Sequence, residues 1–142
     1  MSRVSIIMEG LSENISFARV VATAFITPLD PTVEEVTEIK TAVSEAVTNA
    51  IIHGYPANSS QGQVRMELSA KDKTIVIEIT DDGVGIADID AAREPLFTTN
   101  EELERSGLGF TVMESFMDKV TVESTVGEGT KITLTKTLAS RV

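Results

Sequence analysis

Residues 41–55 read Thr-Ala-Val-Ser-Glu-Ala-Val-Thr-Asn-Ala-Ile-Ile-His-Gly-Tyr, and they close a long amphipathic segment that starts near Val33. Along this segment the apolar residues recur three or four positions apart, as on a helix with one buried stripe: Val36, Ile39, Val43, Val47, Ala50 and Ile51. Glu45 and Asn49 are four residues apart, so a helix places them one turn apart beside that stripe. A solvated helix flank would explain this pair without any function, and the residues downstream are needed to decide.

Length and composition indicate one domain, residues 1–142, with one hydrophobic core. The chain has 142 residues, 42% of them hydrophobic, which leaves no room for a second core. It has no cysteine, which suits a reducing compartment, and no signal-peptide core or membrane-crossing apolar run. We therefore expect a soluble, cytoplasmic protein that does not enter a membrane. The net charge of −10, with no basic patch, argues against direct binding to nucleic acid.

The first half of the chain predicts a strand, two helices and a hairpin. Residues 3–9 alternate loosely and predict an edge strand, and residues 12–25 predict a helix with Ser12 as its N-cap. Thr32 is placed to cap the long helix, which should end near His53 and Gly54. Apolar and polar residues then alternate in two runs, which predicts a β-hairpin over residues 64–70 and 74–80.

The second half predicts an irregular segment, a helix and a second hairpin. Residues 93–109 lack periodicity and suit a mobile lid, and a turn at Gly107 and Gly109 should begin a helix that reaches Met117. Residues 120–126 and 130–138 predict the closing hairpin. Together these elements predict an α+β two-layer sandwich, in which a mixed, mostly antiparallel sheet carries helices on one face.

Three glycine-bearing segments follow the long helix: Asp81-Asp82-Gly83-Val84-Gly85, Arg105-Ser106-Gly107-Leu108-Gly109-Phe110 and Gly127-Glu128-Gly129-Thr130. Neither a P-loop nor a dinucleotide fingerprint occurs, and a hairpin turn explains a single Gly-x-Gly about as well as a binding site does. Asp81 is more informative because it directly follows a buried strand. A carboxylate there can accept a hydrogen bond from an exocyclic amine, while Gly83 and Gly85 let the backbone approach a planar base.

In their order and residue types these segments resemble the ATP-binding domain that gyrase, Hsp90, histidine kinases and MutL share. Within that superfamily the chain is most similar to the anti-sigma serine kinases. The strings that carry this resemblance are Ser-Glu-Ala-Val-Thr-Asn-Ala-Ile-Ile-His-Gly-Tyr, Pro-Leu-Phe-Thr-Thr and Glu-Leu-Glu-Arg-Ser-Gly. The similarity runs from about Ser12 to Thr135, and it implies the histidine-kinase-like ATPase fold and ATP or ADP as the ligand.

The resemblance also implies roles for particular residues. Asp81 would read the adenine amino group, assisted by Thr130, and Asn49 would supply an oxygen ligand to Mg²⁺. Glu45 would act on the seryl hydroxyl near the γ-phosphate, where Arg105 would offset the transition-state charge. A salt bridge from Arg105 to a neighbouring glutamate is the alternative without nucleotide. The remaining nucleotide-binding residues would be Gly83, Gly85, Thr98, Thr99, Ser106, Gly107 and Gly109, the last two through helix N-terminal amides that hold phosphate oxygens.

The function that follows from the resemblance is an ATP-dependent protein serine kinase that also inhibits a sigma factor. Its partners would be a sporulation sigma factor of the F type, contacted by Arg19, and an anti-anti-sigma protein phosphorylated on serine. A homodimer is implied in the same way. Ile15 and Asn100 depart from the family pattern, where an acidic residue and a lysine are expected.

Two alternatives remain open from the sequence. One is a nucleotide-gated sigma-binding module with little or no catalysis, because sites that bind ATP and sites that use it overlap. The other is the ATP-binding half of a histidine kinase. That second alternative fits poorly, since the one histidine, His53, lies on the Asn49 helix and no phosphoacceptor helix pair occurs.

Overall fold

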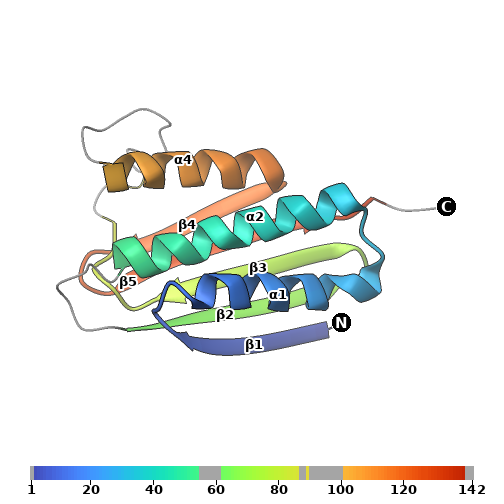
Figure 1. The fold of residues 1–142 in the computed structure, drawn as a ribbon, viewed down its shortest axis with the longest axis horizontal. Helices are drawn as coiled ribbons and strands as arrows, with labels where there is room; N and C mark the ends of the chain where they lie inside the picture. Colours follow the sequence, from blue (N-terminus) through green and yellow to red (C-terminus); the bar gives the residue numbers. More distant parts are fainter. Residues whose placement is uncertain (1, 55–61, 87–88, 90–100, 140–142) are drawn as a thin grey trace.

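The computed structural model describes residues 2–54, 62–86, 89 and 101–139, and it has two layers (Figure 1). One layer is a sheet with the strand order β1-β2-β3-β5-β4, made of β1 Ser2–Glu9, β2 Gln63–Lys71, β3 Thr74–Asp81, β4 Lys119–Thr125 and β5 Gly129–Thr137. The other layer covers one face of the sheet and contains α1 Asn14–Ile26, η1 Thr27–Leu29, α2 Val33–Asn49, η2 Ala50–Gly54 and α4 Glu101–Phe116. The α+β two-layer sandwich is confirmed. Between the described strands, where a mixed sheet was expected, every pairing is antiparallel.

The face of the sheet under the helices is built from apolar rows that run across neighbouring strands. Ile79 of β3 pairs with Met66 of β2 on one side and with Ile132 of β5 on the other, and all three are buried. The next row repeats this arrangement with Leu68, Ile77 and Leu134. Because side chains alternate between the two faces of a strand, the predicted alternation in both hairpins places these residues in the core.

The long helix α2 begins at the predicted cap. Thr32 accepts a hydrogen bond from the Glu35 N–H (3.0 Å), and the Glu35 side chain accepts one from the Thr32 N–H (2.8 Å), so both halves of a capping box are present. Such a cap stabilises a helix by about 1 kcal/mol. Beyond Asn49 the chain continues as the single π-helical turn η2, which packs against β3 and β5.

The start of α2 is tied to the neighbouring chain segments, and we call this the capped end of the molecule. The Ala139 N–H donates to Glu35 Oε2 (2.8 Å), and the Leu138 N–H donates to the Lys73 carbonyl (2.8 Å). Lys73 Nζ in turn donates to the Leu29 carbonyl at the end of η1. At this end of the sheet these polar groups therefore satisfy one another by hydrogen bonds within the protein.

Lys136 connects the sheet to both α2 and α4. Its Nζ donates to the carbonyl of Phe116, the last residue of α4 (2.7 Å), and lies 3.6 Å from Glu38 Oε1 of α2. Lys136 is buried. A cation at a helix C-terminus is favourable because the last carbonyl groups have no partner within the helix. Lys136 thus fixes the end of α4 beside α2.

The helix α1 begins two residues later than predicted. Asn14 is its first residue, and the cap position, Glu13, makes no side-chain capping bond. Ser12 instead belongs to a turn before the helix, in which its carbonyl accepts the Ile15 N–H (3.1 Å). The Asn14 side chain donates to the Glu9 carbonyl (2.7 Å). The predicted Ser12 cap is therefore wrong, because the start of α1 is held by the end of β1.

The helix α4 begins at Glu101, well before the predicted glycine turn. Residues 101–105 are glutamate, leucine and arginine, which favour a helix. A glycine inside a helix costs about 1 kcal/mol relative to alanine. Gly109 accepts this cost where the packing is close, since a Cβ there would lie 3.0 Å from Glu45 Oε2. The predicted turn at Gly107 and Gly109 is wrong, because both residues lie inside α4.

The face of the sheet away from the helices is polar. Lys131 and Glu78 form an ion pair across β5 and β3 (3.2 Å), and Arg3 and Glu67 form one across β1 and β2 (3.6 Å). Pairs as exposed as these contribute about 0–1 kcal/mol. Of the helices in the described ranges, none combines the length and the apolar run that crossing a bilayer requires.

Candidate functional site

Glu45 and Asn49 lie at the far end of α2 from its cap. Asn49 is 6% exposed, and Glu45 is partly buried and lies against α4 at Gly109. The two helices run antiparallel: Glu38 reaches the end of α4 through Lys136, and Glu45, seven residues later, reaches Gly109. The Asn49 side chain is therefore buried, and the Glu45 side chain is partly buried where α2 meets α4.

The apolar rows of the sheet give way to polar residues at this same end. Asp81, the last residue of β3, pairs with Thr130 at the start of β5, and Thr130 pairs with Ser124 of β4. Residues paired directly across strands point to the same face, so these three side chains lie side by side under the helices. We call them the polar row. Asp81 and Thr130 are 4% and 5% exposed.

The carboxyl group of Asp81 has a raised pKa, which favours its protonated form. Burial raises the pKa of Asp81 to about 6, and the negative charge of Asp82 acts in the same direction. Hydrogen bonds from the Gly83 N–H (2.9 Å to Oδ1) and the Thr130 N–H oppose this rise. A buried carboxylate whose pKa is shifted in this way is typical of a functional site, where an incoming hydrogen-bond donor can stabilise its ionised form.

Two glycines allow the backbone around Asp81 to close up. Gly129 has φ +115°, and a Cβ there would lie 2.0 Å from the Asp81 carbonyl oxygen. Gly85 has φ +78°, and a Cβ there would lie 2.4 Å from the Thr125 carbonyl oxygen. Only glycine fits these positions without strain. A third glycine, Gly83, also contacts the polar row, because its N–H donates to Asp81 Oδ1.

Ser124 is a site residue that the sequence analysis missed. Its hydroxyl oxygen lies 2.8 Å from Thr130 Oγ1, accepts the Ile86 N–H (2.7 Å) and donates to the Gly129 carbonyl (3.0 Å). The available signal was the alternation of β4, in which Val120 and Val122 point inward and a serine takes the next inward position. A hollow of about 220 Å³ opens at this corner and is lined by the polar row together with outward-facing residues such as Thr80 and Lys131.

Several of the predicted site residues lie outside the described residues or in the first half of α4. Thr98, Thr99 and Asn100 lie outside the described residues. For Arg105, Ser106 and Gly107 the structure gives the helical backbone of α4. N–H groups inside a helix bond to carbonyl groups four residues earlier, so amides at Gly107 and Gly109 do not form a free helix N-terminus here. Their contact with phosphate stays a prediction.

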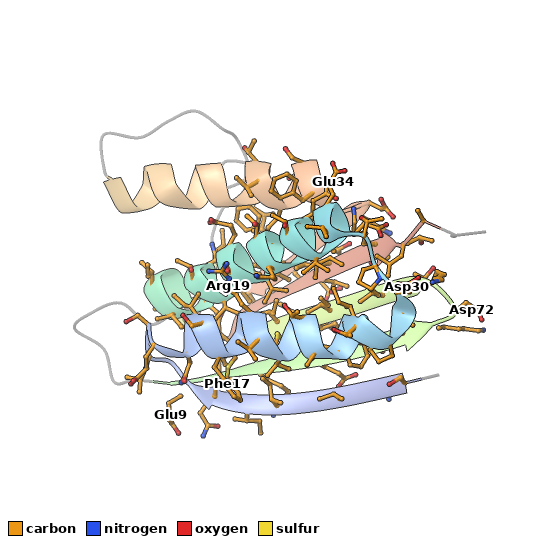
Figure 2. All side chains as sticks on the ribbon, turned by 45° about the vertical axis from the view of Figure 1, so that its right-hand side comes forward. Glu9, Phe17, Arg19, Asp30, Glu34 and Asp72 are labelled. Atoms are coloured by element: carbon orange, nitrogen blue, oxygen red, sulfur yellow. The ribbon has the colours of Figure 1, made fainter. Side chains whose placement is uncertain are left out.

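Arg19 lies on α1, apart from the polar row. It lines a second hollow of about 440 Å³ with Val20 of the same helix and Lys40 of α2. Figure 2 shows Arg19 on the side of α1 that faces α2, and Phe17 on the side of β1. Phe17 and Val20 are 52% and 65% exposed, which is high for large apolar residues.

Comparison with known proteins identifies the fold. A family model described as the histidine kinase-like ATPase domain matches residues 8–136. A crystal structure of RsbU and RsbW domains from Mycobacterium tuberculosis superposes with a TM-score of 0.69 at 17% identity, covering 100% of this chain and 34% of that one. The catalytic domain of the histidine kinase ThkA superposes with a TM-score of 0.59 at 18% identity, covering 97% of both chains. At these identities the two structures support the fold alone.

Curated relatives are much more similar in sequence. An anti-sigma F factor from Bacillus licheniformis is 58% identical over 130 residues, covering 92% of this chain and 88% of the relative. The anti-sigma F factor of Bacillus subtilis strain 168 is 57% identical with the same coverage. That of Geobacillus thermodenitrificans is 59% identical over 128 residues, covering 90% of this chain and 87% of the relative. The chain therefore belongs to the histidine kinase-like ATPase domain family and, within it, to the anti-sigma F factors.

Proposed function

We propose that the chain is an ATP-dependent serine kinase that also binds and inhibits a sigma factor, and that it phosphorylates an anti-anti-sigma protein on serine. The observation that carries the kinase half is a juxtaposition of side chains. The partly buried Glu45 and the buried Asn49 lie in the last two turns of α2, at the same end of the molecule as the buried Asp81 carboxylate. The sigma-binding half rests on the anti-sigma F factor relatives and on the hollow beside Arg19.

The adenine base is proposed to bind at the polar row. An ionised Asp81 accepts hydrogen bonds only, which suits the exocyclic amine of adenine. Gly83 and Gly85 give the base a surface of backbone without side chains. Thr98, Thr99, Ser106 and Gly107 are proposed to contact the rest of the nucleotide.

The phosphates are proposed to lie near Glu45 and Asn49. Mg²⁺ prefers oxygen ligands and takes one or two protein groups together with phosphates, so the buried Asn49 amide fits it, with the Glu45 carboxylate one turn away. When bound, the ion would neutralise phosphate charge. Asn49 would hold it, and Glu45 would accept or orient the proton of the substrate seryl hydroxyl. Arg105 is proposed to offset charge on the transferred phosphoryl group, a role worth about 10³–10⁵ in rate in other enzymes.

Replacing Glu45 by Gln tests this proposal. The amide keeps the shape of the side chain but cannot take a proton, so ATP should still bind while phosphate transfer falls by about 10²–10⁴. The measurement is mass spectrometry of a candidate anti-anti-sigma protein after incubation with Mg-ATP, with nucleotide affinity measured in parallel. The matched control is Glu38→Gln, which changes a carboxylate on the same flank of α2, two turns away. Unchanged transfer in Glu45→Gln would contradict the role of Glu45. If the wild type bound ATP but transferred nothing, a nucleotide-gated binding module would be favoured instead.

The sigma factor is proposed to bind at the hollow between α1 and α2. Arg19 and Lys40 place two positive charges there in a chain with a net charge of −10, and Val20 adds an exposed apolar contact. A partner segment with acidic and apolar residues matches this surface. Ile15 also lies on α1, so its departure from the family pattern is expected to alter partner preference.

Charge reversal by Arg19→Glu should release the sigma factor and leave the kinase rate near that of the wild type. Reversing a charge at a protein interface typically costs several kcal/mol, or about 10²-fold or more in affinity. Co-purification or surface plasmon resonance with an F-type sporulation sigma factor measures the first effect. Loss of both activities would contradict a separate binding surface.

The homodimer that the family resemblance implies is a separate proposal. Analytical ultracentrifugation of the wild type and Arg19→Glu would test it by measuring the mass of the particle in solution.

A further inference from the structure

The hydroxyl of Ser124 has more hydrogen-bond partners than protons. It lies 3.0 Å from the Gly129 carbonyl, 2.7 Å from the Ile86 nitrogen and 2.8 Å from Thr130 Oγ1. A serine hydroxyl offers one proton and two acceptor positions. Each partner therefore constrains what the other two can do.

The direction of each bond follows from counting. The Gly129 carbonyl can only accept, so it takes the Ser124 proton. The Ile86 N–H can only donate, so it fills one acceptor position on Ser124. The bond to Thr130 could run either way from geometry alone, but the Ser124 proton is already used. All three contacts are hydrogen bonds at once only when Thr130 donates its own proton to Ser124.

This arrangement leaves the Thr130 oxygen as an acceptor. Its one hydroxyl proton points toward Ser124, so only lone pairs remain on the side of Asp81, its neighbour in the polar row. Thr130 is 5% exposed, so little water is present to compete for those lone pairs. Asp81, when ionised, is also an acceptor. A group that enters between these two residues thus meets acceptors alone.

We propose that Ser124 is a specificity-determining residue, which fixes the direction of the Thr130 hydroxyl so that this corner accepts an exocyclic amine and rejects an exocyclic carbonyl. The inference rests on the proposed nucleotide binding at the polar row. Adenine carries an amine at its six-position, where guanine carries a carbonyl oxygen. Ser124 is a positioning residue because it acts through Thr130. It also holds the segment after Gly85 in place through the Ile86 N–H.

The test is the ratio of affinities for ADP and GDP, measured by calorimetry with Mg²⁺ present. Diphosphates avoid turnover, and the ratio cancels any loss that affects both nucleotides equally. In Ser124→Ala the Thr130 hydroxyl loses its acceptor on β4. It can then turn and donate its proton to the exocyclic carbonyl of guanine. We expect the preference for ADP to fall about 10-fold or more, the usual size of one donor–acceptor mismatch. Ser124→Thr keeps the hydroxyl and should restore the preference.

Thr121→Ala is the matched control, because it removes a hydroxyl from the opposite face of the same strand. Its ADP to GDP ratio should equal that of the wild type. Thr130→Val removes the acceptor itself and should also lower the ratio of affinities for ADP and GDP, which provides a second test should Ser124→Ala fail to fold. Where both single variants fold, their effects should not add in the double variant Ser124→Ala, Thr130→Val, because both act on one hydroxyl.

The outcomes separate the two levels of the proposal. A folded Ser124→Ala that binds ADP with the wild-type preference over GDP overturns the role of Ser124, as does an unchanged preference in Thr130→Val. A wild type that binds neither nucleotide overturns the proposed function, and the role of Ser124 with it. A general loss of affinity with the ratio preserved would mean that Ser124 only supports the local structure.

Discussion

The two ends of the sheet shift the pKa of a carboxyl group in opposite directions. At the capped end, burial alone would raise the pKa of Glu35, but the N–H groups of Thr32 and Ala139, the Thr32 hydroxyl and the charge of Lys136 together hold it below its usual value. At the other end, burial raises the pKa of Asp81 to about 6 in spite of two N–H donors. The fold therefore stabilises Glu35 as an anion, whereas it favours the protonated form of Asp81 although two N–H groups donate to it. The charge of Glu35 is balanced within the fold, while the ionised form of Asp81 would be stabilised by a further donor.

The backbone also differs between the two ends. At the capped end, besides the capping box and ordinary hydrogen bonds, Asp30 and Asp72 have positive φ (56° and 55°), which aspartate tolerates better than most residues. Around Asp81 the backbone needs glycines with positive φ in close contact with neighbouring carbonyl groups. Strain of this kind collects at functional sites, where the surrounding structure compensates for it.

The largest expected effect comes from Gly129→Ala. A Cβ there would lie 2.0 Å from the Asp81 carbonyl oxygen at φ +115°, so the β3–β5 pairing must shift. We expect a loss of roughly 3–5 kcal/mol in the free energy of unfolding, from backbone strain and overpacking together. Urea unfolding measures it. Gly127→Ala is the control, because Gly127 also has positive φ (+83°) but nothing lies within 4 Å of its Cβ position, so only about 1 kcal/mol should be lost. Equal losses would show that contact with Asp81 is unimportant.

The next effect comes from Asp81→Asn. The Asn oxygen can accept the bonds from Gly83 and Thr130, which turns its NH₂ group toward the base. This group then faces the exocyclic amine of adenine, and two donors cannot form a hydrogen bond. Loss of a hydrogen bond to a charged group costs about 1.5–3 kcal/mol, so nucleotide affinity should fall about 10²-fold. Calorimetry with ADP measures this. Asp82→Asn, at the exposed neighbouring residue, is the control and should bind nearly normally.

The same variant should change how stability depends on pH. The pKa of Asp81 is raised from 3.8 to about 6 by folding, so its stabilising contribution is complete below pH 3.8 and is lost as the pH rises through 6. The loss amounts to about 3 kcal/mol, at 1.36 kcal/mol for each pH unit. Asp81→Asn should therefore become more stable relative to the wild type as the pH is raised from 4 to 7. A constant difference between the two unfolding curves would contradict the raised pKa.

The smallest effect is expected at the capped end, from Glu35→Gln. The amide preserves the capping box but places an NH₂ group against the Ala139 N–H, so about 1–2 kcal/mol of stability should be lost. Nucleotide affinity should not change. Because folding lowers the pKa of Glu35, its contribution is present above its usual value of 4.5 and is lost as the pH falls through the folded value. A tenfold weaker affinity for ADP in this variant would show that the two ends are coupled.

The sequence was sufficient to predict the fold wherever a local pattern coincided with burial. The alternation in β2 and β3 and the Thr32 cap of α2 are such cases, and both follow from neighbouring residues alone. The start of α4 was not predictable in this way. Gly109 suits a turn by its own preference, and the close approach of Glu45, which favours a residue without a side chain inside the helix, is visible only in the folded chain.

The candidate site was predictable in part for a related reason. Asp81 could be found because a carboxylate directly after a buried strand is unusual, but its raised pKa depends on burial by distant residues. Ser124 is harder to find, because serine is common in exposed strands and the alternation of β4 shows only that it faces inward. Its three partners, the adjacent residues Gly129 and Thr130 of β5 and Ile86 after β3, are brought to it only by the folded chain.

The polar row lies one step beyond the last apolar row and shares its strand register. A slip of β5 by a single residue would turn Thr130 to the outer face and bring Lys131 beneath the helices, while expelling Ile132 and Leu134 from the core. Misaligned chains would thus expose large apolar surfaces, which cellular quality control recognises. Because the two rows share one register, a chain that buries Ile132 and Leu134 correctly also places Thr130 beneath the helices, next to Asp81.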